Sequence, residues 1–236
     1  MRLDKFLSES TSLSRKEIKR LIKAGEVFVN GAAASRPEQQ VNEQDIAEVR
    51  GERIEYKRYV YLVLNKPAGY VSASEDKRYP CVTELAGEKY AHYGVFPVGR
   101  LDVDTEGLLL LTNDGGFAHA VASPKKNVYK RYFARLDTPA EEKDKALFET
   151  GMKFKDFTAM PARLEICADP REVFIEIAEG KYHQVKRMAE RAGKKVIYLK
   201  RVAIGSLALP EDSAPGDIFE AEKGWLCEKI GIRSDI

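Results

Sequence analysis

Apolar residues recur at helical spacing along the first part of the chain. Two groups share a helical face on either side of a polar stretch: Leu3, Phe6 and Leu7, then Ile18, Leu21 and Ile22. Ser14 and Glu17 form a capping-box pattern before the second group, and Gly25 suits its end, where a left-handed residue is favoured. The pattern predicts two short amphipathic helices.

Further along, the hydrophobic pattern becomes that of strands. Residues 26–29 precede Asn30-Gly31, a strong hairpin signal. Leu108 to Leu111 form an unbroken run, which predicts a buried strand because a half-exposed one would show a large apolar patch to water. More strands are expected at residues 59–64, 130–136, 173–177 and 196–202, and helices at 117–121, 139–151, 183–192 and 225–230.

The expected strands and helices do not alternate in a regular β-α-β rhythm. This order favours an α+β fold, with a mainly antiparallel mixed sheet flanked by helices, over a doubly wound fold. The chain has 236 residues, enough for one domain of good size and a small one. Residues 50–58 are highly charged and contain Gly51, so they are the expected linker. The predicted units are a small domain with its linker at 1–57 and a larger domain at 58–236.

Charge is segregated along the chain although the formal net charge is only +2. Residues 1–36 carry eight Lys and Arg against four acids, whereas residues 37–55 carry six acids against two Arg. A locally basic module at the start of the chain indicates a polyanionic partner.

Cysteine and histidine are few. Cys81, Cys167 and Cys227 are scattered, so no disulfide framework is visible and a reducing cytoplasm is expected. The three histidines are isolated from one another and from cysteine, so no metal site is predicted. The first residues lack the apolar core of a signal peptide, and no apolar run approaches the roughly 20 residues of a membrane span.

An acidic loop directly before the leucine run is the strongest candidate for chemistry. Asp102, Asp104 and Glu106 would lie at the mouth of a core strand, where functional carboxylates often occur. A calcium loop is one alternative, but its last ligand position would fall on Asn113 instead of Glu. An ordinary polar turn is the other alternative.

A family resemblance favours catalysis. The stretch G-R-L-D-V-D-T-E-G-L-L-L-L-T at residues 99–112 resembles the catalytic motif of the RsuA-type pseudouridine synthases, which modify ribosomal RNA. Three more segments resemble motifs of that family in the same order: N-K-P-A-G-Y-V at 65–71, K-R-Y at 130–132 and E-G-K-Y-H-Q-V-K-R-M at 179–188. The resemblance makes Asp102 the catalytic residue.

The resemblance also implies roles for residues around Asp102. The reaction would convert uridine to pseudouridine within RNA without a cofactor. Tyr132 would lie against the uracil, and Lys186, with Arg187 as the substitute, would bring a cation to Asp102. Arg100 either orders the loop or holds a phosphate of the flipped nucleotide. Basic residues near the cleft would contact further phosphates: Lys66, Lys125, Lys126, Lys130 and Arg131.

Simpler structural roles compete with several of these assignments. Lys186 could pair with Glu190 one helical turn away. Tyr132 could be a core aromatic, and His183 is expected to make local hydrogen bonds at a helix start instead of acting as a base.

The first 50 residues resemble the small αL-type RNA-binding domain first described in a ribosomal small-subunit protein. By this resemblance, the domain presents basic side chains to RNA backbone: Arg2, Lys5, Arg15, Lys16, Lys19, Arg20 and Lys23. A solvated basic helix face is the alternative.

The E-G-K-Y-H-Q-V-K-R-M form favours small-subunit (16S) ribosomal RNA, free or in an assembling particle, as the partner of a monomeric enzyme that does not bind membranes. A large-subunit (23S) target is the second choice. A non-catalytic RNA-binding assembly factor and a metal-dependent nuclease using Asp102, Asp104 and Glu106 are alternatives of other classes.

Overall fold

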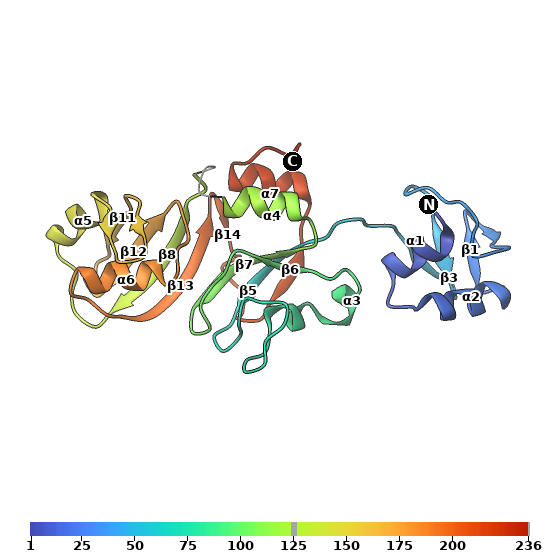
Figure 1. Ribbon diagram of the computed structural model, residues 1–236, viewed down its shortest axis with the longest axis horizontal. Coiled ribbons are helices and arrows are strands. Elements are labelled where there is room, and N and C mark those ends of the chain that lie inside the picture. The colour runs from blue at the N-terminus through green and yellow to red at the C-terminus, as the bar shows by residue number, and fades with distance from the viewer. Residues whose placement is uncertain (124–126, 236) are drawn as a thin grey trace. The chain divides into compact units, whose positions relative to one another are not determined.

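The computed structural model describes residues 1–123 and 127–235, which form two compact units (Figure 1). The first unit comprises Met1–Val60 and Ala86–Val95. The second comprises Tyr61–Leu85 and Phe96–Ile236 and contains the acidic loop.

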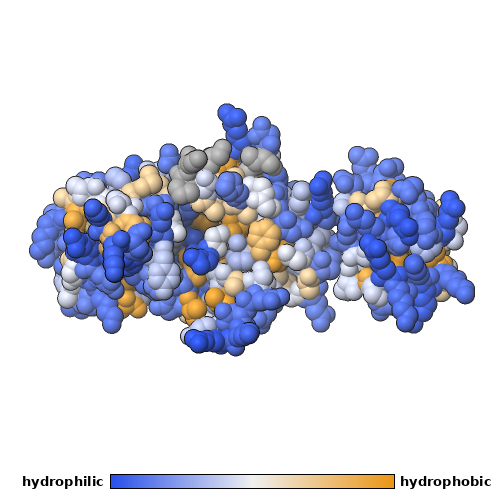
Figure 2. All heavy atoms as spheres, in the orientation of Figure 1, coloured by the Kyte–Doolittle hydropathy of each residue, from blue (hydrophilic) through white to orange (hydrophobic). Residues whose placement is uncertain are grey.

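The first unit is built from short helices and a small antiparallel sheet. Its helices are α1 (Leu3–Ser10), α2 (Arg15–Lys23) and α3 (Gly87–Ala91). Its sheet has the order β2-β1-β3-β4, with β1 (Val27–Val29), β2 (Ala32–Ala33), β3 (Ala47–Val49) and β4 (Glu52–Ile54). The apolar faces of α1 and α2 close over the sheet and form one core: Leu3, Phe6, Leu7, Ile18, Leu21, Ile22, Val27 and Val49 among others. Hydrophilic side chains cover most of the visible surface of this unit (Figure 2).

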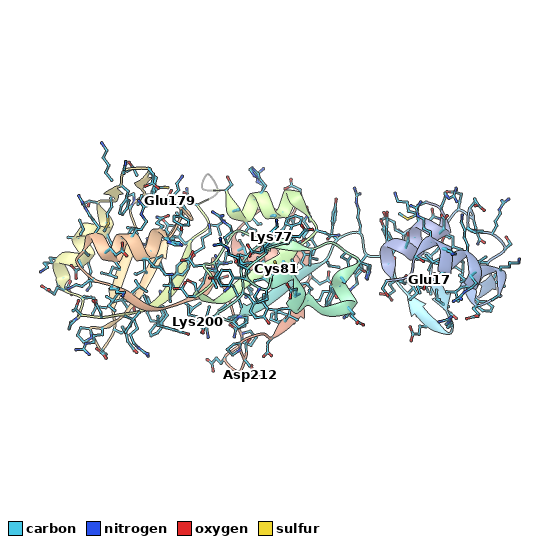
Figure 3. All side chains as sticks on the ribbon, turned by 60° about the horizontal axis from the view of Figure 1, so that its bottom comes forward. Glu17, Lys77, Cys81, Glu179, Lys200 and Asp212 are labelled. Atoms are coloured by element: carbon cyan, nitrogen blue, oxygen red, sulfur yellow. The ribbon has the colours of Figure 1, made fainter. Side chains whose placement is uncertain are left out.

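The capping box and the hairpin turn predicted for the first unit are both confirmed. The Ser14 hydroxyl accepts the Glu17 N–H, and the Glu17 carboxylate accepts the Ser14 N–H, which completes the capping box (Glu17 is labelled in Figure 3). Asn30 and Gly31 both adopt positive φ, 49° and 80°, as the two-residue hairpin turn requires.

The expected linker is partly wrong, because β4 occupies residues 52–54 within it. Arg50 and Gly51, with φ of 55° and 81°, form a second tight turn between β3 and β4. The charged composition concealed this hairpin, since only Ala47 and Val49 of it are buried.

The second unit is organised around a nine-stranded sheet of order β11-β12-β8-β13-β7-β5-β15, with β14 beside β13 and β6 beside β7. Among the strand pairs described for this sheet, β13–β7 alone is parallel, so the mainly antiparallel α+β fold is confirmed. Its strands are β5 (Tyr61–Lys66), β6 (Phe96–Val98), β7 (Glu106–Thr112), β8 (Lys130–Leu136), β11 (Arg163–Ile166), β12 (Glu172–Ile177), β13 (Val196–Ile204), β14 (Leu207–Ala208) and β15 (Ile218–Glu220). A separate two-stranded ribbon pairs β9 (Met152–Lys153) with β10 (Thr158–Ala159).

Helices cover this sheet in two places. Near β5 and β7, α4 (Gly115–Ala122) and α7 (Lys223–Ile230) lie side by side, and both contribute to a core with those strands (Figure 1). Elsewhere, α5 (Glu142–Glu149) packs on β11, and α6 (Gln184–Arg191) contacts β13. A short 3₁₀ helix, η1, spans Val82–Ala86.

For two of the boundaries that differ from those expected, the structure gives the physical cause. The strand β5 continues through Asn65 and Lys66, because both residues pair with β7 and their side chains find internal partners. The helix α5 starts at Glu142, because the capping box forms between Glu141 and Asp144, three residues later than the predicted box at Thr138 and Glu141.

No helix within residues 1–123 and 127–235 is long and apolar enough to cross a membrane.

Candidate active site

The acidic loop lies between β6 and β7, where β7 meets β13 in the parallel pair. Gly107 pairs with Arg201 at this junction and has φ of +101°. A Cβ on Gly107 would overlap the backbone of Arg201, so only glycine permits the strands to approach this closely. The start of β7, and with it the loop that carries Asp102, is thereby set against β13.

Lys66 holds the backbone of the acidic loop in place. Its side chain is fully buried, and Nζ donates to the carbonyl oxygens of Thr105 (2.8 Å), Pro67 (3.0 Å) and Asp102 (3.1 Å). Burial lowers the pKa of Lys66 to about 8 against the attraction of nearby carboxylates. The expectation that Lys66 contacts RNA phosphate is therefore wrong: its ammonium holds backbone inside the protein.

The segment after β5 adds a second clamp on the same loop. The Ser72 hydroxyl donates to the Leu101 carbonyl (2.8 Å) and accepts the Leu101 N–H (3.0 Å). The Gly69 N–H donates to the Val103 carbonyl (2.7 Å). These bonds hold Leu101 and Val103 on either side of Asp102, so the backbone of the candidate catalytic residue is fixed from both directions.

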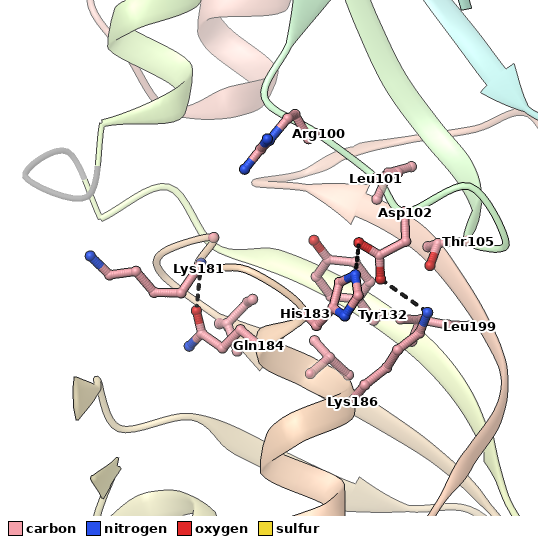
Figure 4. Close-up of a pocket in the computed structure, with 13 residues that line it drawn as sticks. Arg100, Leu101, Asp102, Thr105, Tyr132, Lys181, His183, Gln184, Lys186 and Leu199 are labelled. Atoms are coloured by element: carbon pink, nitrogen blue, oxygen red, sulfur yellow. Dashed lines mark hydrogen bonds and ion pairs between the residues drawn. The ribbon is translucent and has the colours of Figure 1, made fainter. Parts of the chain in front are cut away.

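The Asp102 carboxylate lies between two basic side chains of the α6 region (Figure 4). Lys186 Nζ is 3.0 Å from Asp102 Oδ2 and 2.6 Å from Asp104 Oδ1, and His183 Nε2 is 3.5 Å from Asp102 Oδ1. Burial opposes charge on Lys186, but its hydrogen bonds to the two carboxylates prevail and raise its pKa. Burial is the largest influence on Asp104 and opposes its charge, but the hydrogen bond and the charge of Lys186, with smaller contributions, together lower the Asp104 pKa.

The loop before α6 explains how these side chains reach the carboxylate. Glu179 is buried and accepts hydrogen bonds from Met160 N–H and Gln184 Nε2, while Gln184 Oε1 accepts the Lys181 N–H. His183 closes the loop with a left-handed φ of 50° as the N-cap of α6. The expectation of a merely local role for His183 is therefore incomplete, since its ring faces Asp102.

Arg187 is directed elsewhere. Its guanidinium makes two hydrogen bonds to Asp156 and lies 4.6 Å from the ring centroid of Phe157. Lys186, and not Arg187, is therefore the cation beside Asp102, and substrate binding by Arg187 stays a prediction. Because Lys186 and Arg187 point about 100° apart on the helix, only one of them can face Asp102.

Tyr132 lines the same pocket as Asp102 from strand β8, together with Arg100 and Leu199 (Figure 4). The pocket has a volume of about 50 Å³, and a wider groove of about 670 Å³ shares Arg100, Asp102 and Lys186 with it. Tyr132 is 7% exposed, while Phe133 faces the opposite side of the sheet, where it contacts Phe174 and Tyr198.

Sequence reasoning missed Arg201 of β13. It is 4% exposed, and its Nε donates to the Leu108 carbonyl (2.7 Å) while Nη1 lies 3.5 Å from the Tyr132 hydroxyl. Two charged residues within a largely apolar strand, Lys200 and Arg201, were the available signal, but the partners of Arg201 come from distant β7 and β8.

Glu106, the third carboxylate of the loop, accepts a hydrogen bond from the Tyr198 hydroxyl, 2.8 Å away. Burial and then this bond raise the pKa of Tyr198 to about 12. Within the described part of the chain, no group of three or more His, Cys, Asp or Glu side chains is arranged to hold a metal ion.

The basic side chains expected to contact RNA are placed in different ways. Arg2 pairs with Asp4 and Glu38, and Lys5 with Glu9. The five basic residues of α2 are exposed and have no ion pair among the described residues: Arg15, Lys16, Lys19, Arg20 and Lys23. In the second unit, Arg131 pairs with Glu165 and Glu176. Lys125 and Lys126 lie outside the described residues.

The site thus combines a carboxylate fixed beside an ammonium group, a buried tyrosine and a pocket open to a groove. The family model described as RNA pseudouridylate synthase matches residues 60–191, and the S4 domain model matches residues 1–46. This chain belongs to the RNA pseudouridine synthase family. The family and the fold that the sequence motifs indicated are confirmed.

Relatives match nearly the whole length of this pseudouridine synthase. An uncharacterized RNA pseudouridine synthase, YtzG, of Bacillus subtilis (strain 168) is 42% identical over 226 residues, covering 93% of this chain and 94% of the relative. Ribosomal small subunit pseudouridine synthase A of Escherichia coli (strain K12) is 37% identical over 228 residues, covering 92% and 94%. A solved pseudouridylate synthase crystal structure superposes with a TM-score of 0.68 at 35% identity, covering 98% and 99%.

Proposed function

We propose that this pseudouridine synthase isomerises a specific uridine of small-subunit (16S) ribosomal RNA, with Asp102 as the catalytic carboxylate. The observation that carries the proposal is the Asp102–Lys186 contact of 3.0 Å in a pocket shared with Tyr132. The Lys186 ammonium offers the Asp102 carboxylate a charge partner inside the pocket.

The chemistry follows from this charge. Breaking the bond between uracil N1 and ribose C1′ leaves positive character on C1′, which a nearby carboxylate stabilises. Asp102 serves the step either by bonding to C1′ until C5 displaces it, or by taking the C2′ proton and returning it to C2′ when C5 joins C1′. The uracil then turns so that C5 joins C1′, C5 loses its proton and N1 gains one. Tyr132 offers a flat face to the base and a hydroxyl for the proton transfer at C5.

The target uridine must leave its stack to reach Asp102, which costs a few kcal/mol in a folded RNA. RNA contacts elsewhere offset this cost. The exposed basic face of α2, within residues matched by the S4 domain model, supports such a role for Arg15, Lys16, Lys19, Arg20 and Lys23, with Arg2 and Lys5 beside them. We assign this role to a domain at residues 1–57 and catalysis to residues 58–236.

Two features support the small-subunit target. The E. coli relative carries that substrate in its name at 37% identity, and the 179–188 segment has the form that favours it. We propose that the cytoplasmic substrate is this RNA, free or in an assembling small-subunit particle, and that the enzyme acts as a monomer.

Base-resolved mapping of pseudouridine tests the target. Unmodified small- and large-subunit ribosomal RNA and partly assembled particles are incubated separately with the enzyme. One new pseudouridine in small-subunit RNA, free or assembled, is expected. A new pseudouridine in large-subunit RNA alone contradicts the target, and no product in any substrate contradicts the enzymatic proposal.

A further inference from the structure

Two buried cationic side chains near Tyr132, those of Lys130 and Arg201, form no ion pair in the part of the chain that the structure describes. Lys130 precedes Tyr132 by two residues on β8 and is 7% exposed, and Arg201 on β13 is 4% exposed. Among the described residues, Lys130 Nζ and Arg201 Nη2 have no hydrogen-bond partner. Alternate residues of a strand share a face, so Lys130 and Tyr132 lie on the same side of the sheet.

Such an arrangement is costly unless a ligand uses it. Buried charges in proteins are ordinarily paired, and an unpaired one disfavours the folded state. Burial, and then repulsion from Arg201, lower the pKa of Lys130 to about 8. Arg201 Nε donates to the Leu108 carbonyl and Nη1 donates to the Tyr132 hydroxyl. Nη2 is therefore the donor that it has left to offer.

Both cations line one cavity, which has a volume of about 190 Å³. The cavity shares Arg100, Tyr132, Gly180 and Lys181 with the pocket at Asp102. Most of the polar side chains in its lining are donors, and its carboxylate, Glu179, already accepts hydrogen bonds from Met160 and Gln184. A ligand in this cavity would be an anionic group that belongs to the same molecule as the substrate at Asp102.

We propose that this cavity binds a phosphodiester group of the flipped target nucleotide, with Lys130 and Arg201 as its ligands. The inference rests on the proposed function, because that function places the ribose of this nucleotide at Asp102. The phosphates on either side of a ribose are only a few bonds from C1′, so anchoring one of them positions C1′ against the carboxylate. A uracil carbonyl is neutral and would not offset two buried positive charges.

Lys130 can reach a phosphate without backbone movement. Its ammonium stands on a flexible four-carbon stem, and rotation about the terminal bonds brings Nζ into the cavity. An entering phosphate pairs with the charged form of Lys130 and supplies the missing partner of Arg201 Nη2. Binding energy would thus come from relieving a cost built into the free enzyme.

The test compares Lys130→Met with wild type on short synthetic RNAs that span the modified uridine. Methionine keeps the length of the side chain and removes its charge. A neutral methylphosphonate replaces either the 5′ or the 3′ phosphate of the target nucleotide. At one position, wild type should lose at least about 10-fold in affinity, since a charge-assisted contact is lost. Lys130→Met should bind the unmodified RNA as weakly as wild type binds the methylphosphonate RNA. It should lose no further affinity when the methylphosphonate stands at that position.

The control is Lys143→Met, which removes an exposed lysine of α5 and should behave as wild type at both positions. Equal losses in wild type and Lys130→Met, or no loss in wild type, overturn the proposal. If wild type forms no pseudouridine in any RNA, the proposed function fails, and inorganic phosphate then tests the subsite alone. At constant ionic strength, phosphate should raise the Tm of wild type more than that of Lys130→Met, and equal shifts overturn the subsite.

Discussion

Two buried lysines of the second unit, Lys66 and Lys130, have pKa values lowered to about 8 by the same cause, burial, yet they differ in their surroundings. Lys66 Nζ is surrounded by the carbonyl oxygens of Pro67, Asp102 and Thr105, so its charge is used within the fold. Lys130 Nζ has no partner among the described residues. The first stabilises the acidic loop, whereas the second is a cost to the free protein.

Replacing Lys66 by Met should damage the loop more than the rest of the fold. The change leaves several buried carbonyl oxygens without a donor, and each unsatisfied group costs about 1–3 kcal/mol. We expect a lower free energy of unfolding and a turnover rate at saturating RNA reduced about 10-fold, because Asp102 loses its fixed position. Urea unfolding and single-turnover rates measure the two effects. A variant with wild-type rate and stability contradicts the role of Lys66.

Replacing Lys130 by Met should stabilise the free enzyme in a pH-dependent way. The folded chain gives up the Lys130 proton near pH 8, whereas the unfolded chain keeps it until about pH 10.5. Unfolding therefore takes up a proton between these values, so the wild-type free energy of unfolding rises with pH relative to the variant. The variant should be more stable by about 1–3 kcal/mol at pH 7, with the difference vanishing near pH 10.5. Urea unfolding across this range measures it, and a pH-independent difference contradicts the assignment.

At the scale of elements, the active site depends on the parallel contact of β7 with β13. This contact joins a part of the sheet containing β5, β6 and β7 to a part containing β8, β11 and β12. Asp102 precedes β7, whereas Tyr132 lies on β8 and Lys186 on the helix before β13. The alignment of the two parts therefore sets the geometry of the site.

Gly107→Ala tests this alignment. The added Cβ would overlap the Arg201 backbone, and the φ of +101° disfavours any residue with a side chain. We expect a loss of about 2–4 kcal/mol in the free energy of unfolding and reduced activity in the fraction that folds. Gly115→Ala at the start of α4 is the matched control, because its Cβ would meet nothing within 4 Å. Thermal or urea unfolding of both variants measures the difference, and equal stabilities contradict the account.

Elements with local signals could be predicted from the sequence, and those with distant partners could not. The α2 capping box, the Asn30-Gly31 turn and the bounds of β8 follow from neighbouring residues. The short strands β9, β10, β14 and β15 were missed because two or three residues carry no clear periodicity. The capping box of α5 was predicted at the wrong place, because the carboxylate that accepts the N-cap N–H is that of Asp144 instead of Glu141. Lys194, from beyond α6, forms an ion pair with Asp144 there.

At the scale of the whole molecule, the two units divide binding from chemistry in our proposal. The sequence placed Asp102, Lys186 and Tyr132 in one family constellation, and the structure brings their side chains to one pocket. The sequence did not reveal the inward direction of Lys66 or the role of Arg201, because a lysine or arginine in a sequence does not show whether its charge faces water or backbone. Burial of a charge is decided by strands far apart in the chain.

Neutralising the basic face of α2 should weaken RNA binding without slowing catalysis. Lys16→Gln, Lys19→Gln and Lys23→Gln together remove three exposed charges from one helical face. Each lost phosphate contact lowers the dependence of log K on log salt by about 0.7–0.9, so the slope should fall by about 2 to 3. Titrations at several salt concentrations measure it, and Lys143→Gln with Lys145→Gln on α5 is the control. An unchanged slope contradicts RNA binding by α2.

The central claim is that the Asp102 carboxylate performs the reaction. The most direct measurement is the single-turnover release of tritium from RNA labelled at uridine C5, with saturating enzyme and no added metal. Asp102→Asn should lower the rate at least about 1,000-fold while the Kd for RNA changes less than about threefold, because the shape is kept and the charge is lost. Asp104→Asn, the same change two residues away in the same loop, should keep most of the activity. An Asp102→Asn enzyme that retains more than about a tenth of the wild-type rate would contradict the account.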